Sequence, residues 1–295
     1  MEKRFYLMNS PELPTPGTHF YCTSKFMSGF TYYGYQTAVA NTLDDITDHS
    51  IVLLSDHGSV NHNFFKNLEY LAAKFPNCIY ICWFYHDYYE RVPFKYFVIT
   101  GEHFRKKPEA SHFEHWELQQ RISNYIPLTF SSNMVPEQVG TLPRPNPSLR
   151  DGCFIGTPYK PEWVYNLPNI AYITGNNLPE QDRINIFLSS KIAFGFHMSC
   201  NIDNHVIVER VFEAMAFGCP VISDSPDAGE LTGGIVQVAH NHQEFLEIYH
   251  RLLNNDAERE ELRQRGYEWV KQYGLYVHTA KNFLDGFAKL WPGVF

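Results

Sequence analysis

The predicted fold rests on residues 192–224, which read IAFGFHMSCNIDNHVIVERVFEAMAFGCPVISD. The stretch opens with an apolar run of strand length, passes through a polar loop, and then repeats apolar residues at helical spacing over 206–217. Gly218 lies just past the end of that helix and Pro220 just beyond, which is the usual order at a helix C-terminus. The apolar run at 221–223 then predicts a second strand.

A strand, a helix and a second strand form a βαβ unit, in which the two strands lie parallel. The loop before the helix therefore opens at the carboxyl edge of the sheet, where open α/β sheets bind ligands. The predicted helix begins at Val206, and the free N–H groups at a helix start suit a phosphate. The helix carries Glu209, Arg210 and Glu213, for which a solvated stripe with an internal ion pair is the alternative to ligand binding.

Length, composition and charge restrict the class of protein. The chain has 295 residues, of which 44% are apolar, and this suits one large or two medium domains. The 24 basic and 32 acidic residues give a formal net charge of −8, so we expect no nucleic acid among the partners. The sequence shows no signal-peptide pattern and no apolar run of transmembrane length. Six cysteines without a CxxC pair indicate reduced thiols and a cytoplasmic location.

Strand-like and helix-like runs alternate along most of the chain, as in parallel sheets covered by helices on both faces. The segment TLPRPNPSLR at 141–150 holds three prolines in ten residues and is the predicted linker. We expect a Rossmann-like domain over 1–145, a second over 146–274, and a C-terminal helix over 275–295 that returns to the first domain. The expected fold class is α/β, with two doubly wound domains facing each other across a cleft.

The N-terminal domain carries a second, weaker pattern. Residues 19–23 are expected as a strand, residues 24–34 as a loop with two glycines, and residues 35–43 as a helix. Such a loop could hold a phosphate or an acceptor, although its glycine spacing is not GxGxxG.

Two segments, VERVFEAMAFGCPVISD at 208–224 and DAGELTGGIVQV at 227–238, resemble the C-terminal half of GT-B fold glycosyltransferases. The resemblance is closest to the superfamily called glycosyl transferases group 1, whose members carry F/L-E-A-M/L-A-x-G-x-P-V-I on a helix. It covers residues 153–274, while the first half of the chain resembles these enzymes only in architecture. The resemblance implies a hexosyl- or pentosyltransferase that uses a UDP or GDP sugar as its donor.

The resemblance also assigns roles to individual residues. The glutamate at the position of Glu213 binds the ribose hydroxyls of the donor in this family. Arg210 is expected near the diphosphate, because arginine offers a fixed fork of donors to phosphate oxygens. Family members often place a lysine or arginine near the position of Lys160 against the donor phosphates, and an ordinary surface lysine is the alternative. His205 stands where retaining members have a second glutamate, so an inverting reaction is favoured. The remaining residues expected at the donor are Val206, Glu209 and Glu230.

An inverting transferase needs a general base that deprotonates the acceptor hydroxyl. Three carboxylates follow predicted strands of the first domain, namely Asp56, Asp87 and Glu102. Asp56 is placed first, because a clean buried strand precedes it and Gly58 follows soon after. For each of the three, the capping of a loop is the alternative role.

The sequence predicts no metal site and no other cofactor. The 14 histidines complete no metal-binding spacing, and the resemblance implies a metal-independent reaction. The expected partners are a nucleotide sugar and a hydroxyl of a glycan or other small-molecule acceptor. A sugar-nucleotide epimerase of the GT-B type and a non-catalytic GT-B scaffold are the alternatives. The sequence does not determine the donor sugar, the catalytic base, the acceptor or the oligomeric state.

Overall fold

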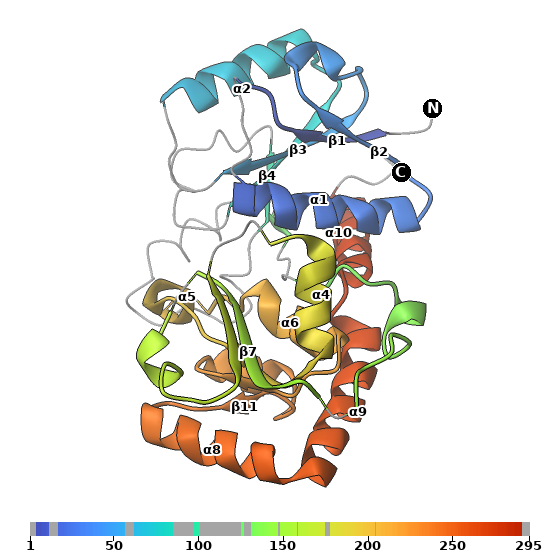
Figure 1. The fold of residues 1–295 in the computed structure, drawn as a ribbon. Helices are drawn as coiled ribbons and strands as arrows, with labels where there is room; N and C mark the ends of the chain where they lie inside the picture. Colours follow the sequence, from blue (N-terminus) through green and yellow to red (C-terminus); the bar gives the residue numbers. More distant parts are fainter. Residues whose placement is uncertain are drawn as a thin grey trace. The chain divides into compact units, whose positions relative to one another are not determined.

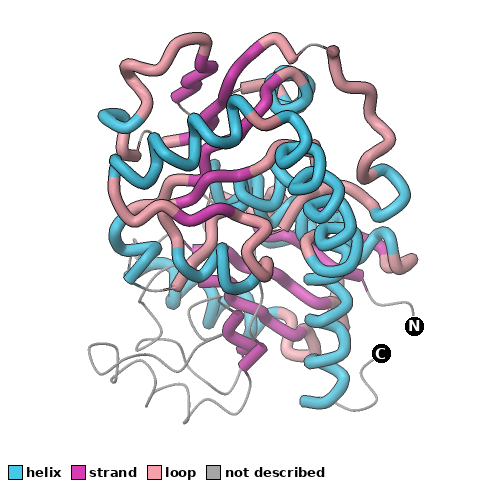
Figure 2. The backbone as a smooth tube through the Cα atoms, turned by 90° about the horizontal axis from the view of Figure 1, so that it is seen from below, coloured by secondary structure: helices cyan, strands magenta, loops and turns pink. Residues whose placement is uncertain are grey.

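The computed structural model describes residues 4–11, 17–56, 62–84, 97–100, 125–126, 131–146, 148–157, 159–174, 178–203 and 205–290. The chain divides into two compact units, residues 1–129 with 276–295, and residues 130–275. Each unit holds a parallel β-sheet with helices (Figures 1 and 2). The predicted class, α/β with two doubly wound sheets, is confirmed.

The first unit is built on a six-stranded sheet in the order β2-β1-β3-β4-β5-β6, and all of its paired strands are parallel. The strand order reverses between β1 and β3, as in doubly wound folds. Its strands are β1 (Arg4–Met8), β2 (Gln36–Ala40), β3 (Ile51–Asp56), β4 (Ile79–Phe84), β5 (Phe97–Thr100) and β6 (Tyr125–Ile126). Its helices are α1 (Gly17–Tyr32), η1 (Leu43–Asp45), α2 (His62–Lys74) and α10 (Tyr276–Leu290).

The expected strand, loop and helix over 19–43 are wrong. The structure has one helix, α1, followed by strand β2, which pairs with β1 from Gln36 onward. Gly29 lies inside α1, where an added Cβ would come within 2.5 Å of the Tyr276 carbonyl oxygen and 2.7 Å of the Ala280 Cβ. The glycine therefore allows α1 to approach α10 closely and does not mark a loop.

The second unit is built on a five-stranded parallel sheet in the order β11-β10-β9-β7-β8, and its order reverses between β7 and β9. The strands are β7 (Arg150–Gly156), β8 (Ile170–Thr174), β9 (Ser190–Gly195), β10 (Val221–Ser223) and β11 (Gln237–Val238). The helices are η5 (Pro136–Gln138), η6 (Pro161–Trp163), α4 (Glu180–Leu188), α5 (Ser199–Asp203), α6 (Glu209–Ala216), α7 (Pro226–Leu231), α8 (His242–Asn254) and α9 (Asp256–Tyr273).

The βαβ unit predicted over 192–224 is present as β9, α6 and β10, and β9 runs parallel to β10. The helix begins at Glu209, not at Val206. The backbone N–H of Val206 donates to the carbonyl of Asn201 at 2.7 Å, and His205 adopts a left-handed φ of 57°. This turn closes helix α5, which lies in the segment expected as a loop, and delays the start of α6.

The proline-rich segment 141–150 lies within the second unit, whereas the division between the units falls at 129–130. Arg144 anchors this segment, because its guanidinium donates to the carbonyl oxygens of Phe217 and Ser190. Helix η5 also contacts α9, which holds the residues before the segment in the same unit. Among the helices that the structure describes, none is long and apolar enough to cross a membrane.

Candidate functional site

Charged and polar side chains gather at the carboxyl edge of the second unit's sheet. Strands β7, β9 and β10 end there, and the order reversal between β7 and β9 is the point where open α/β sheets bind ligands. These side chains come from the loops that follow the three strands and from helices α4 and α6, which are labelled in Figure 1. They are Lys160, Arg183, His197, Arg210, Glu213 and Asp224.

His197 and Asp224 form the buried centre of this group. The His197 backbone N–H donates to the Asp224 carboxylate at 3.0 and 3.2 Å, and its Nδ1 lies 2.7 Å from Oδ1. The Nε2 atom accepts the backbone N–H of Val208 at 3.1 Å. Because Nε2 accepts, the proton is on Nδ1, which donates to Asp224, and the imidazole is neutral.

The two members of this pair have shifted pKa values. Burial lowers the pKa of His197, although Asp224 opposes the shift. Burial alone would raise the pKa of Asp224, but the hydrogen bond from His197 and the charge of Lys160 outweigh it, so the pKa is lowered. Asp224 is therefore a carboxylate at neutral pH.

Lys160 is held by the same carboxylate. Its Nζ lies 2.9 Å from Asp224 Oδ2 and 4.4 Å from the centre of the Trp163 ring. Lys160 precedes helix η6 and has a left-handed φ of 49°. The ammonium is thus fixed at the sheet edge by one charge and one aromatic face.

Arg210 lies in the first turn of α6 and is packed closely by its neighbours. Its guanidinium carbon is 4.9 Å from the Phe154 ring centre and 6.0 Å from that of Tyr159, and Nη1 donates to the Phe196 carbonyl at 3.2 Å. Gly156 lies against it, since a Cβ there would come within 2.8 Å of Nη2. Burial lowers the pKa of Arg210 to about 10, so the group is charged at neutral pH.

Glu213 lies on the buried side of α6 and is only 5% exposed. Its Oε2 is 3.7 Å from Nη1 of Arg183, which comes from α4. The solvated-stripe alternative is therefore wrong for Glu213, because its carboxylate is not on a solvated face.

The other residues expected at the donor lie differently. His205 pairs through Nδ1 with Asp227 Oδ2 at 3.0 Å, and the N–H of Val206 is used by Asn201. Glu209 is the first residue of α6, where a carboxylate suits the helix dipole. Glu230 is exposed and belongs to helix α7.

The three candidate bases belong to the first unit. Asp56 is the last residue of β3 and pairs in register with Phe84 of β4. Strand β3 adjoins β1 at the order reversal, so the backbone places Asp56 at the carboxyl edge next to that point. Asp87 and Glu102 lie outside the described residues.

Three residues of this group are not among the site residues predicted from the sequence. From the sequence, His197 and Arg183 could line the site of the nucleotide base or the phosphates, but no functional role was the favoured interpretation, and Asp224 was interpreted as the end of a strand. The signal for His197 and Asp224 was their position directly after predicted strands at the ligand-binding edge. No local signal indicated that Arg183 would meet Glu213, because their contact depends on how α4 packs on α6.

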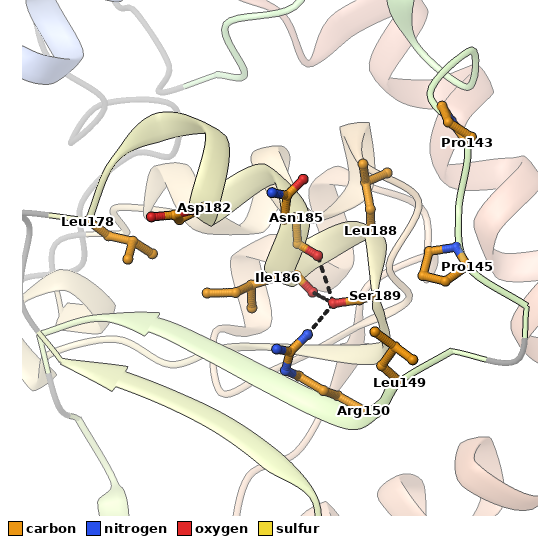
Figure 3. A pocket seen from close by; sticks show the side chains of 10 residues that line it. All are labelled: Pro143, Pro145, Leu149, Arg150, Leu178, Asp182, Asn185, Ile186, Leu188 and Ser189. Carbon is orange, nitrogen blue, oxygen red and sulfur yellow. Dashed lines mark hydrogen bonds between the residues drawn. The ribbon is translucent and has the colours of Figure 1, made fainter.

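A separate cavity of about 520 Å³ lies between the segment around Pro143 and helix α4 (Figure 3). Most of its wall is apolar, and the Arg150 guanidinium within it donates to Ser189 Oγ. None of the charged residues above lines it. Within the described part of the chain, no cluster of three or more His, Cys, Asp or Glu side chains is arranged to hold a metal ion.

Comparison with known proteins gives this site a context. Residues 146–285 match a protein family described as "Glycosyl transferase-like". A search of curated protein sequences finds no significant match. An alpha-glucosyltransferase solved with UDP and a 13-mer DNA containing an HMU base has a TM-score of 0.65 at 11% identity, over 96% of this chain and 98% of that one.

Two further structures share the fold. A glycosyltransferase from Rickettsia africae ESF-5 has a TM-score of 0.61 at 11% identity, over 99% of each chain. An alpha1,3-fucosyltransferase has a TM-score of 0.54 at 13% identity, over 98% of this chain and 90% of that one. The predicted GT-B fold is confirmed by these similarities. The prediction of a glycosyltransferase is confirmed by the family match together with them.

One expectation about partners is wrong. The net charge of −8 was taken to exclude nucleic acid, yet several similar structures are alpha-glucosyltransferases solved with DNA. Net charge averages over the whole surface, whereas contact with a nucleic acid depends on the local field of one face. The charge of the chain therefore does not exclude a nucleic-acid acceptor.

Proposed function

We propose that this protein transfers a sugar from a nucleotide diphosphate donor to an acceptor hydroxyl, and that the donor binds at the carboxyl edge of the second unit's sheet. The observation that carries this proposal is a buried carboxylate, Glu213, at the same sheet edge as two fixed cations, Arg210 and Lys160. All three lie inside the segment that matches the glycosyl transferase-like family. Solved relatives of the same fold contain UDP or UDP-glucose.

The diphosphate is assigned to Arg210, Lys160 and the start of α6. Arg210 presents a planar fork of N–H donors that fits phosphate oxygens, and Lys160 adds a point charge. The positive end of the helix dipole of α6 favours an anion in the same place. As the glycosidic bond breaks, these groups stabilise the negative charge that develops on the leaving diphosphate. We therefore propose a reaction that needs no metal ion.

The ribose is assigned to Glu213. An ionised carboxylate is an acceptor only, with two oxygens, so it suits the two vicinal hydroxyls of a ribose. A buried carboxylate also gives stronger hydrogen bonds than one in water.

The chemical step is assigned to the first unit. In an inverting transfer, the acceptor oxygen attacks the anomeric carbon, the bond from that carbon to the phosphate oxygen breaks, and a base takes the hydroxyl proton. Asp56 is the proposed base, because β3 ends with it beside the strand-order reversal. The incomplete glutamate motif at His205 favours inversion over retention.

The acceptor is proposed as a hydroxyl of a glycan or small molecule, with a nucleic acid as the second class to test. The DNA in the alpha-glucosyltransferase structures motivates the second class. A cytoplasmic location is proposed from the cysteines, of which Cys78, Cys153 and Cys219 are buried thiols outside any disulfide.

A thermal-shift screen with UDP, GDP, ADP and CMP sugars tests donor binding. One nucleotide class should raise Tm, since a ligand at 100 times its Kd stabilises the folded state by about 2.7 kcal/mol. Analysis of the products formed from the donor alone then separates a transferase from an epimerase. No shift with any nucleotide would contradict the proposal and favour a non-catalytic scaffold.

A further inference from the structure

Arg183 and Glu213 lie on two helices, α4 and α6, that also meet at a second contact one helical turn further along each helix. Arg183 and Phe187 are separated by four residues on α4, and Glu213 and Phe217 are separated by four residues along α6 and its C-terminal cap, so each pair shares a helix face. Phe187 stacks on Phe217, with ring centres 5.9 Å apart and planes 11° apart. One aromatic contact and one ion pair therefore join the two helices.

This arrangement fixes where the Arg183 guanidinium can lie. Phe187 is 2% exposed and packs in the interior, and α4 contacts both β7 and β9. The Arg183 side chain is itself only 16% exposed. A buried aromatic contact on a sheet-packed helix leaves Arg183 little freedom to move away from Glu213.

The geometry of the contact indicates how Arg183 acts. The distance of 3.7 Å from Nη1 to Oε2 makes it an ion pair and not a hydrogen bond, so this contact does not itself use a lone pair of Oε2. Arg210, three residues earlier on α6, is also electrostatically coupled to Glu213. Two cations thus attract the Glu213 carboxylate in its buried position.

We propose that Arg183 is a positioning residue for recognition of the ribose. It holds the Glu213 carboxylate in its orientation towards the vicinal hydroxyls and makes no contact with the nucleotide. The site would then bind ribonucleoside diphosphates more tightly than deoxyribonucleoside diphosphates, and Arg183 would contribute to this selectivity without contacting the ligand. This role rests on the assignment of Glu213 to the ribose under the proposed function.

The test uses calorimetric titration of the full chain with UDP and 2′-deoxy-UDP, or with the corresponding pair for whichever base the donor screen selects. Wild type, Arg183→Met, Glu213→Gln and the double variant are compared, with circular dichroism to verify folding. Arg183→Met should weaken UDP binding about tenfold, or about 1.4 kcal/mol, and change 2′-deoxy-UDP binding less than about twofold. In the Glu213→Gln background, Arg183→Met should have no further effect.

Two control variants keep the test decisive if Arg183→Met folds poorly. Arg183→Lys keeps the charge and should recover part of the discrimination between UDP and 2′-deoxy-UDP. Lys191→Met removes the cation of another partly buried ion pair in the same unit, with Asp151 at 2.7 Å, and should leave both affinities unchanged.

Each outcome decides between specific alternatives. An equal loss of affinity for both nucleotides in Arg183→Met would mean direct contact with the nucleotide and would overturn the positioning role. If Glu213→Gln abolishes discrimination while both Arg183 variants keep it in full, only the role of Arg183 fails. If Glu213→Gln binds UDP as the wild type does, the proposed function of Glu213 fails.

Discussion

His197 and Asp224 are joined at 2.7 Å between Nδ1 and Oδ1, and both side chains are almost completely buried. Through its other ring nitrogen, His197 accepts the N–H of Val208 at the start of α6, and through its other oxygen Asp224 holds Lys160. One buried carboxylate therefore connects the loop after β9, the end of β10 and the residue before η6. The positions of the proposed phosphate-binding groups depend on this connection.

The pH dependence of stability should reflect His197. Its pKa is lowered in the folded state, so on acidification below about 6.5 the unfolded chain binds a proton at this position before the folded chain does. The free energy of unfolding should therefore fall as pH drops from about 7 to 5, and protonation of Asp224 should lower it further under more acidic conditions. Urea unfolding at a series of pH values measures this effect.

Because the chain holds other histidines, the pH dependence of stability must be compared between the wild type and His197→Gln. The variant should lose part of the wild-type slope of stability against pH between about 7 and 5. Identical slopes in the two proteins would contradict the assignment of this dependence to His197.

Replacement of Asp224 should destabilise the second unit. Asp224→Asn removes the charge that faces Lys160 and replaces an acceptor of the His197 ring N–H, and breaking a buried pair of this kind costs about 3 kcal/mol. Asp151→Asn breaks a more exposed pair with Lys191 and should cost less than about 1 kcal/mol. Chemical denaturation measures both variants, and equal losses would contradict the special role of Asp224.

Gly156 should be required for the position of Arg210. It has a φ of 137°, and an added Cβ would lie 2.8 Å from Arg210 Nη2. Gly156→Ala should cost about 1–3 kcal/mol in backbone strain and displace the guanidinium, which weakens binding of a nucleoside diphosphate. Gly234→Ala is a suitable comparison, because Gly234 also has a positive φ of 78° but faces open space. Gly234→Ala should lose stability without losing affinity for a nucleoside diphosphate. An equal loss of affinity in the two variants would contradict the requirement for Gly156 beside Arg210.

Gly29 should be required for the packing of α1 on α10. An added Cβ would lie 2.5 Å from the Tyr276 carbonyl oxygen, so Gly29→Ala should destabilise the first unit by about 1–3 kcal/mol through overpacking. Ser28 is the exposed neighbour on the same helix, and Ser28→Ala should change stability by less than about 0.5 kcal/mol. A stable Gly29→Ala protein in thermal denaturation would show that the helices can separate at little cost.

The sequence indicates β9, α6 and β10 because their signals are local. A strand-length apolar run, helical periodicity and the pair Gly218 and Pro220 all lie within 33 residues of one another. The segment 17–40 was predicted wrongly because its aromatic residues suit a strand or a helix, and the choice depends on packing. Gly29 meets Tyr276, at the opposite end of the chain, and no local pattern contains that contact.

The candidate site also has residues that the sequence predicts and residues whose arrangement depends on contacts between distant segments. Glu213, Arg210 and Lys160 were predicted as donor-binding residues from the family resemblance, and the structure places them at one sheet edge without testing their roles. His197 and Asp224 are 27 residues apart, and their bond becomes predictable only once β9 and β10 are paired. The proline-rich segment resembled a linker by composition, but Arg144 binds it to the second unit through contacts with residues 46 and 73 positions later.

The most direct test of donor binding is the affinity of Glu213→Gln for a nucleoside diphosphate, measured by calorimetry. Glu268→Gln, the same substitution at an exposed position of α9, is the matched control. Loss of a charged acceptor for the ribose hydroxyls should weaken binding by about tenfold or more, since hydrogen bonds to charged groups contribute about 1.5–3 kcal/mol. Wild-type affinity in Glu213→Gln, with the variant folded as the control is, would contradict the placement of the donor at α6.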